Sequence, residues 1–557
     1  MAEETFDLVV VGAGAAGMTA AATAAAKGLS VIVVEKTAFI GGNTSFSGGM
    51  VYVPHNGKMD EAGRPDDPAE AMRYLDLAVP TEDGRDARAR FVEKGREAVE
   101  FLESHTAVRL KPVMFYPDYY PDLEGARDGL RVLEPVAFDA SSLGSWFSKL
   151  RPPIPEFTIL GGMMVAREDL PHFRNFKRSL RSFLRVTRLV TEHGLQRLRH
   201  HRGSRLVLGN ALAGRLLQSL LDRKVTILTD CSVLDVVIAD GKATGLRVVH
   251  DGKERVIEAR RGVMLATGGF SHGPDKRRAW LPSAASPDSP FAPGSTGDGL
   301  ELGTAAGGVV VTDNANNAYW SPASIYKRAD GRKVVYPHTV TDRGKPGSLV
   351  VNKAGRRFTS EAVSYHRFGE ALLTEGNLPA WIICDSRFIW KYGLGAIIPF
   401  TSNLDPYREA GYLHSADTLP ALAKKLGIDE AGFAETMALF NADATLGTDS
   451  AFARGEDIYA RYLGDAENQP NPCLAPLLKG PFHAIELVLS DLGTAAGLRT
   501  DLDCRVLDAG GQPIQGLYAV GNDMLSIMRG HYPGPGITLG PALTFGYLAA
   551  CHIAGNG

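Results

Sequence analysis

The segment RGHYPGPGITLGP, residues 529–541, sets one phenol, Tyr532, among prolines and glycines near the end of the chain. Proline fixes φ and removes an N–H donor, whereas glycine permits positive φ and lets the backbone approach a ligand closely. The segment therefore predicts a rigid loop that holds a phenol and bare amides in one place. A phenol offers one neutral hydrogen bond, which suits a ketone, while an arginine suits a carboxylate. What this phenol and these amides face is indicated by the rest of the chain.

The N-terminus carries a dinucleotide-binding pattern. Its parts, in order, are an apolar run at 6–11, the glycine unit Gly12-Ala-Gly14-Ala-Ala-Gly17, an alanine-rich helix at 18–27, a Gly28 stop, and a second strand at 30–34 closed by Glu35. In such a unit the first glycine makes the tight turn, the second admits the pyrophosphate, and the third lets helix and strand pack. The positive end of the helix dipole faces the phosphates, and the acid binds ribose hydroxyls. A dinucleotide site is therefore expected here.

Composition and charge limit the classes of protein to which the chain can belong. The 557 residues, 44% of them hydrophobic, exceed one ordinary core, so two or more domains are expected. The formal net charge of −3 gives no reason to expect nucleic acid as a partner. The five cysteines are scattered without a CxxC pair, which indicates neither a disulfide framework nor a zinc site, and no metal is expected. The start lacks the features of a signal peptide and no apolar stretch could span a bilayer, so we expect a cytoplasmic protein.

The identity of the dinucleotide is indicated by the stretch that follows Glu35. The glycine and hydroxyl cluster at 41–50 resembles the second flavin-binding stretch of the fumarate reductase and 3-ketosteroid dehydrogenase superfamily. Further matches to that superfamily follow in the same order at 266–270, 295–299, 352–361 and 516–522. The resemblance implies FAD. Members that attach FAD covalently carry a histidine in the cluster, and this chain has none between Gly41 and Met50, so non-covalent FAD is expected.

The resemblance also implies which residues hold the cofactor. They lie in the glycine unit, after the second strand, in the 41–50 cluster and in the later matches. The expected cofactor-binding residues are Gly12, Ala13, Gly14, Ala15, Ala16, Gly17, Glu35, Lys36, Gly42, Asn43, Thr44, Ser47, Gly48, Gly49, Met50, Val233, Ala266, Thr267, Gly268, Asp298, Gly521, Asn522, Gly536, Ile537 and Leu539.

Within the superfamily, the C-terminal segment separates substrate classes. Fumarate reductases and succinate dehydrogenases carry an arginine there that clamps a dicarboxylate, whereas this chain has Tyr532. The comparison implies that the substrate is a carbonyl compound. The whole stretch 530–550 looks like the C-terminal signature of 3-ketosteroid Δ1-dehydrogenases. Residues 116–121, YPDYYP, resemble that family's "YSDYYPE" loop. Residues 361–368 resemble its "NESxPY" stretch, although Ser364 stands where the family has proline.

Family chemistry then assigns roles to four residues. Tyr532 and the amide of Gly536 would hold the C3 carbonyl oxygen and stabilise the enolate that forms as C2 loses a proton. Tyr365 would be the base, with Tyr119 lowering its pKa by a hydrogen bond, and the flavin N5 would accept hydride from C1. An ordinary phenol has a pKa of about 10, so such a base needs a neighbour that stabilises the phenolate. The alternative is that Tyr119, Tyr120 and Tyr365 only line a core edge.

The resemblance implies an α/β fold built from two domains. A Rossmann-like FAD-binding domain would use 1–312 and 486–557, and an inserted α+β catalytic or cap domain would occupy 313–485, with the active site between them. An excursion at about 155–206 departs from the shorter family members. Its part 167–205 holds eleven Arg or Lys against three acids.

The excursion also contains an apolar stripe at helical spacing, formed by Phe176, Leu180, Phe183, Leu184 and Val190. Basic charge with an apolar stripe predicts a helix lying in an anionic membrane interface, on the inner face of the cell membrane. The alternative is a solvated basic helix packed on its own domain or on a dimer partner.

Three function hypotheses follow. The first is 3-ketosteroid or sterol Δ1-dehydrogenation, with a quinone-like or other electron acceptor. The second is another flavoenzyme reaction, either 4-ene formation on a related 3-ketosteroid or reduction of an α,β-unsaturated acid. The third is a non-catalytic FAD electron carrier or adaptor. The tyrosine set favours the first, and the sequence leaves the oligomeric state open.

Overall fold

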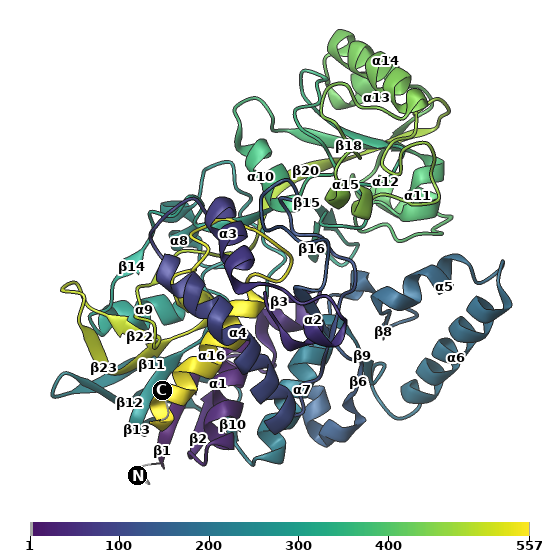
Figure 1. Cartoon of the computed structure of the whole chain (residues 1–557). Coiled ribbons are helices and arrows are strands. Elements are labelled where there is room, and N and C mark those ends of the chain that lie inside the picture. The colour runs from purple at the N-terminus through teal and green to yellow at the C-terminus, as the bar shows by residue number, and fades with distance from the viewer. Residues whose placement is uncertain (1–3, 556–557) are drawn as a thin grey trace.

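The computed structural model describes residues 4–555, and Figure 1 shows their arrangement. An eight-stranded sheet forms the larger part of the molecule, and its parallel portion runs in the order β10-β2-β1-β13-β23. The strands of this sheet are β1 Glu4–Val11, β2 Val31–Val34, β10 Thr226–Leu228, β11 Cys231–Ala239, β12 Lys242–His250, β13 Lys253–Leu265, β22 Arg505–Leu507 and β23 Pro513–Ala519. The chain contributes to this sheet from both of its ends, as the α/β prediction requires.

The N-terminal dinucleotide pattern folds as a strand, a turn and a helix. The second half of strand β1, residues 8–11, is a continuous apolar run because a central parallel strand is covered on both faces, and Leu8, Val9 and Val10 are fully buried. Helix α1, Ala15–Ala26, begins three residues before the predicted start because the extended Gly14 already forms its N-cap. It packs against α16, Leu539–Ala554, where small residues such as Gly546 permit close contact.

A second, antiparallel sheet carries the inserted part of the chain. Its order is β16-β15-β20-β18-β17, with β19 paired to β20. These strands are β15 Ala318–Lys327, β16 Lys333–Pro337, β17 Ser348–Asn352, β18 Ala380–Asp385, β19 His414–Ala416 and β20 Phe482–Thr494. The helices α13 Leu419–Leu426 and α14 Glu430–Leu446 lie at its outer end (Figure 1). The unit is α+β, as expected.

Strand β20 links the two parts of the molecule. Its first half pairs with β18 and its second half with β15, so the strand runs through position 485, where the sequence places a domain boundary. The division into 1–312 with 486–557 and 313–485 stays a prediction, and residues 1–3 and 556–557 of it lie outside the described residues.

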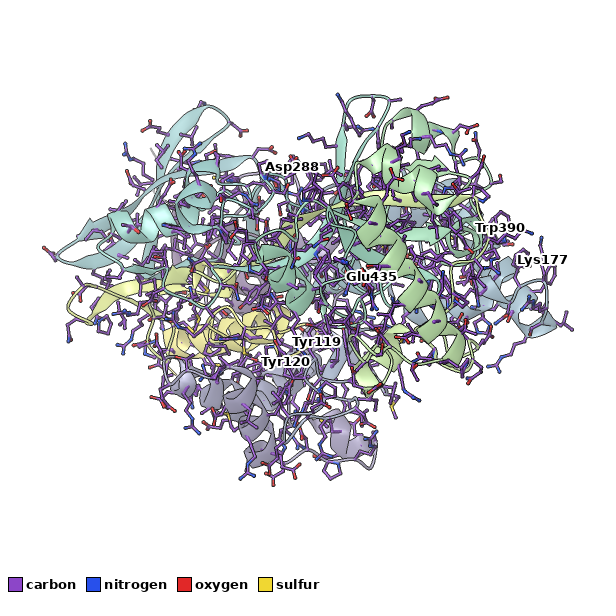
Figure 2. The ribbon with its side chains drawn as sticks, turned by 90° about the horizontal axis from the view of Figure 1, so that it is seen from above. Tyr119, Tyr120, Lys177, Asp288, Trp390 and Glu435 are labelled. Atoms are coloured by element: carbon purple, nitrogen blue, oxygen red, sulfur yellow. The ribbon has the colours of Figure 1, made fainter. Side chains whose placement is uncertain are left out.

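The basic segment forms two helices that stand out from the larger part of the molecule. They are α5 Leu170–Arg174 and α6 Leu180–Arg197, and Figure 1 shows them at its edge, apart from α7 Leu208–Asp222. In Figure 2, which views the molecule from above, Lys177 between the two helices also lies at the rim. None of the described helices combines the length and apolarity needed to cross a bilayer.

Candidate active site

One cavity of about 460 Å³ contains most of the residues that the sequence singles out. Its size is in the range of pockets that bind small molecules and cofactors. It is lined by all of the expected cofactor-binding residues except Gly17 and Ile537, and also by Tyr119, Tyr365, Tyr532 and Gly536. The structure therefore brings the dinucleotide loop and the tyrosines into one space.

The two exceptions have other positions. A Cβ at Gly17 would lie 2.1 Å from the carbonyl oxygen of Gly12 and 3.2 Å from Val10, so this glycine allows α1 to pack closely on β1. This is the role expected of the third glycine in the unit. The Ile537 side chain is buried beside the cavity and lines a small adjoining void with Thr538.

The glycine unit forms a cradle for phosphate. Gly12 has φ +103°, and a Cβ there would lie 2.3 Å from the carbonyl oxygen of Ala266, so only glycine fits the turn. A Cβ at Gly14 would meet no atom within 4 Å, which places Gly14 at the open side of the cradle. The amide of Ala15 at the start of α1 donates to Thr44 Oγ1 at 3.0 Å. The helix N-terminus and open backbone fit a pyrophosphate group.

The acid after β2 is fixed at the wall of the same cavity. Glu35 accepts hydrogen bonds from the amide of Ala13 at 3.1 Å and from the amide of Thr37 at 2.9 Å. Next to it, Lys36 Nζ lies 2.7 Å from Asp298 Oδ2, which ties the first part of the chain to α9, Asp298–Ala305. These residues fit the ribose end of a dinucleotide, so the residues present match the requirements of FAD.

Three phenols meet at the other end of the cavity. The ring centroids of Tyr365 and Tyr532 are 5.2 Å apart, those of Tyr119 and Tyr365 are 5.5 Å apart, and those of Tyr119 and Tyr532 are 5.7 Å apart. All three side chains are buried. Figure 2 places Tyr119 near the middle of the molecule with the neighbouring Tyr120. Three segments far apart in sequence thus deliver one cluster of hydroxyls.

Local structure explains how Tyr365 is held. It is the first residue of α10, Tyr365–Leu373, and the Oγ of Ser364 caps that helix by accepting from the amide of Arg367 at 3.3 Å. A serine at this position is a favourable N-cap, which proline cannot supply. The departure from the family pattern therefore leaves Tyr365 at the start of a capped helix on the cavity wall.

The Gly536 backbone is shaped by its neighbours. Its φ is +92°, and a Cβ would lie 2.3 Å from the carbonyl oxygen of Met50, so no other residue fits there. Its carbonyl accepts from the amide of Tyr52 at 3.2 Å. Among residues 4–555, no hydrogen bond from the Gly536 amide is found, which leaves this donor on the cavity wall for a ligand.

Burial controls the electrostatics of the phenols. It raises the pKa of Tyr365 well above the ordinary value of a phenol, and the nearby Tyr532 and Tyr116 raise it further, while the neighbouring Tyr119 hydroxyl acts in the opposite direction. Burial also raises the pKa of Tyr119 strongly and that of Tyr532 to about 12. For Tyr365, the effect of burial is larger than that of Tyr119.

The Tyr119 hydroxyl is buried and has no hydrogen-bond partner within the part of the chain that the structure describes. A buried polar group without a partner costs stability. Such an atom on a cavity wall is typical of a site completed by a bound molecule.

Sequence reasoning did not identify several residues of the site. Tyr116 and Arg167 line the cavity. Two further tyrosines, Tyr459 and Tyr462, come from α15, Ile458–Leu463. The ring centroid of Tyr459 lies 4.9 Å from that of Tyr119, and the ring centroid of Tyr462 lies 4.6 Å from that of Tyr116. Tyr116 belongs to the quoted YPDYYP motif and could have been included. The other three have no motif, and their place depends on contacts between distant segments.

The apolar stripe of the basic segment is exposed. Leu180, Phe183 and Leu184 are 74%, 50% and 58% exposed, and the opposite face of α6 buries Ser182, Leu189 and His193. The sequence did not single out Leu195 and Leu198, which are exposed as well. The stripe is therefore not part of a core in this chain.

Fold and site together define an FAD-binding flavoprotein. A family model described as "FAD binding domain" matches residues 7–539. The chain is 35% identical to a 3-oxosteroid 1-dehydrogenase of Mycolicibacterium smegmatis, with 100% of this chain and 98% of the relative covered. It is 38% identical to a 4-oxocyclohex-2-ene-1-carboxylate 5-dehydrogenase of Sinomonas cyclohexanicum, over 98% of this chain and 93% of the relative.

A solved structure supports the same family assignment. The 3-ketosteroid Δ1-dehydrogenase from Sterolibacterium denitrificans, in complex with 1,4-androstadiene-3,17-dione, is 35% identical, covers all of both chains and superposes with a TM-score of 0.92. The chain belongs to the FAD-dependent 3-ketosteroid Δ1-dehydrogenase family. The α/β fold, the FAD cofactor and the family predicted from sequence are confirmed.

Proposed function

We propose that this protein is an FAD-dependent dehydrogenase that introduces a double bond between C1 and C2 of 3-oxo-4-ene steroids. The observation that carries the proposal is the convergence of Tyr119, Tyr365 and Tyr532 with the free Gly536 amide in the cavity that the dinucleotide cradle opens into. Bound FAD supplies the acceptor for the hydride that leaves C1.

The carbonyl end of the substrate is held by two neutral donors. The Tyr532 hydroxyl and the Gly536 amide donate to the C3 oxygen, and these bonds strengthen as negative charge develops there. The high pKa of Tyr532, about 12, keeps this phenol protonated at neutral pH, as a donor must be. Polarisation of the carbonyl makes the C2 proton more acidic.

Proton removal falls to Tyr365. Its phenolate oxygen takes the C2 proton, the electron pair of the broken C–H bond forms the enolate, and collapse of the enolate expels hydride from C1. We assign to Tyr119 the role of favouring the ionised form of Tyr365, because its hydroxyl is free of other partners among residues 4–555 and shifts the pKa of Tyr365 downward, against the effect of burial. Two hydrogens leave the steroid, one as a proton and one as hydride, and a 1-ene conjugated to the ketone remains.

The other hypotheses explain fewer of these features. Reduction of an α,β-unsaturated acid would need an arginine at the position that Tyr532 occupies. Arg529, at the start of the same loop, is already paired with Asp83 and Asp313. A carrier without catalysis would need none of the three phenols. Formation of a 4-ene would use the same kind of donors and base but remove hydrogen from C4 and C5 instead of C2 and C1, so product analysis distinguishes it from 1-ene formation.

The test is anaerobic mixing of the purified yellow protein with androst-4-ene-3,17-dione, followed by product analysis. We expect the flavin to bleach and androsta-1,4-diene-3,17-dione to form in equal amount. Reduction of the flavin by 5α-androstane-3,17-dione with only a 4-ene as product would overturn the proposal in favour of 4-ene formation.

We also propose that α5 and α6 bind an anionic bilayer from the cytoplasmic side, where a quinone-like acceptor and apolar sterols are found. Exposed leucines and phenylalanines flanked by arginines match the apolar and anionic layers of such a surface. Leu170, the first residue of α5, is 44% exposed and also lines the cavity, so the cavity wall continues into this face. The same contact would deliver an apolar sterol to the site.

A further inference from the structure

We infer that Arg167 is a substrate-binding residue that pairs with a carboxylate, and that the site accepts, besides steroids, a smaller ketone that carries this carboxylate about one ring away from its carbonyl group. The inference rests on the proposed function, because it uses the same phenols to hold the ketone. It adds a charged group to a substrate site that otherwise recognises a neutral oxygen.

Arg167 is placed on the wall of the substrate end of the cavity. It begins the turn Arg167–Asp169 just before α5, and its guanidinium lies over the ring of Tyr116, 4.9 Å from the centroid. The lining of the same cavity includes the apolar side chains of Phe157, Met164 and Leu170. A charge pair formed in such surroundings is stronger than one formed in water.

The contacts of Arg167 do not satisfy a guanidinium. Its Nη1 donates to the Tyr462 hydroxyl at 2.8 Å, and its Nη2 contacts the Met50 sulfur at 2.9 Å, which is a weak acceptor. Its Nε is 3.8 Å from Glu134 Oε2, too far for a hydrogen bond, and Glu134 is also engaged by Lys111 at 3.3 Å. Within residues 4–555, Arg167 thus has no bidentate carboxylate partner.

The other two cationic side chains on the cavity wall already have partners within the protein. Lys36 is paired with Asp298 at 2.7 Å, and Arg151 donates to Thr37 Oγ1 at 2.9 Å and lies over the ring of Phe39. Both are near the ribose end of the cradle. Arg167 is the cation that the cavity presents on the side of the phenols.

Met50 fixes the separation between the two parts of the substrate. Its carbonyl oxygen abuts Gly536, whose amide faces the ketone, and its sulfur touches Arg167. The guanidinium therefore lies about one methionine side chain from the carbonyl site. A six-membered ring with a ketone and a carboxylate at opposite positions spans such a gap, and its planar carboxylate matches the fork of an arginine.

A different role for Arg167 would be purely structural. Because Tyr462 belongs to the inserted unit, the bond from Arg167 could simply tie that unit to the FAD-binding part. Tyr462→Phe removes this bond and keeps the cation. Arg167→Met removes the cation, while Arg167→Lys keeps a charge without the bidentate geometry.

The experiment compares the acid and the ester of one ketone. Anaerobic flavin reduction is measured for 4-oxocyclohexanecarboxylate and its methyl ester with wild type and the three variants, and binding of each compound is measured by calorimetry. In wild type we expect the acid to exceed the ester in kcat/KM by about tenfold or more. Arg167→Met would leave the bound carboxylate without its cationic partner, so it should lower kcat/KM for the acid by about 100-fold and change the ester by less than about threefold.

Two control variants separate the charge of Arg167 from its hydrogen bond to Tyr462. Arg167→Lys should recover part of the loss, and Tyr462→Phe should keep the preference for the acid. Equal losses for acid and ester in Arg167→Met, or an acid that wild type does not bind better than the ester, would overturn the inference. If neither compound nor a steroid reduces the flavin, the proposed function fails, whereas calorimetric binding of the acid that depends on Arg167 would still support the carboxylate site.

Discussion

The backbone N–H of Tyr119 donates a 3.0 Å hydrogen bond to the carbonyl oxygen of Pro533, the residue that follows Tyr532. The hydroxyl of Tyr74 donates to the same oxygen at 2.5 Å. The loop that carries one phenol is thereby fixed to the loop that carries another. The prolines and glycines around Tyr532 serve this purpose, since they form a loop with one accessible carbonyl and one free amide.

Tyr74 should act as a positioning residue for this junction. Removing its hydrogen bond in Tyr74→Phe should lower stability by about 1 kcal/mol and should also lower kcat, because the Tyr532 hydroxyl loses its fixed position. The readout is a double-mutant cycle: in a Tyr532→Phe background, Tyr74→Phe should have little further effect on kcat. Independent, additive losses would show that Tyr74 affects only stability.

The bound FAD should be released by denaturation. The cluster between Gly41 and Met50 offers no histidine for covalent attachment, so acid precipitation should leave a colourless pellet and a yellow supernatant. Absorbance of both fractions is the measurement. Flavin that stays with the polypeptide would contradict non-covalent binding, and purified protein without flavin would contradict the whole account.

The rate of flavin reduction should increase with pH. Tyr365 acts as a base only when ionised, and burial raises its pKa well above the usual value of about 10. The ionised fraction therefore increases about tenfold per pH unit over the neutral range. At saturating steroid, kcat should rise steadily from pH 7 to pH 10 without a plateau. Because Tyr119 favours the ionised form, Tyr119→Phe should lower kcat at each pH, and a plateau of the wild-type rate below pH 8 would exclude Tyr365 as a base with a raised pKa.

The exposed apolar stripe of the basic segment should determine membrane binding. Changing Phe176, Leu180, Phe183 and Leu184 to serine removes apolar contacts but leaves the arginines and the FAD site unchanged. We expect wild type to sediment with vesicles containing phosphatidylglycerol, and the variant to remain in the supernatant with its flavin bound.

A matched control is available in the inserted unit. Leu446 and Leu478 are 73% and 70% exposed but belong to other surfaces, so their serine variants should bind vesicles as wild type does. If wild type itself fails to bind anionic vesicles, the stripe is an interface with another protein or another copy.

The sequence predicted the parts of the site that local chemistry specifies. Gly12, Gly14 and Glu35 follow from the geometry of a strand, a turn and a helix, and the Tyr532 loop follows from its prolines and glycines. The start of α1 differs by three residues because Gly14 caps the helix through its backbone, without a side-chain signal. The roles of the site residues stay predictions until they are tested.

The parts that could not be predicted depend on distant contacts. Arg167 meets Tyr462 across almost three hundred residues of chain, and in the sequence it belongs to a basic run that indicates a surface. Tyr459 and Tyr462 reach the phenol cluster only because the inserted unit packs on it. Composition and spacing carry no signal for such pairs.

The most direct test of the central claim is the kcat for anaerobic flavin reduction by androst-4-ene-3,17-dione in Tyr532→Phe, with the steroid Kd measured in parallel. If Tyr532 donates to the carbonyl oxygen as charge develops there, its bond is stronger in the transition state than in the bound substrate. Loss of one such donor typically costs about 100- to 1000-fold in kcat, with a much smaller change in Kd. A near-normal kcat in a variant that still binds FAD and steroid would contradict the account and leave Tyr532 a structural residue of a rigid loop.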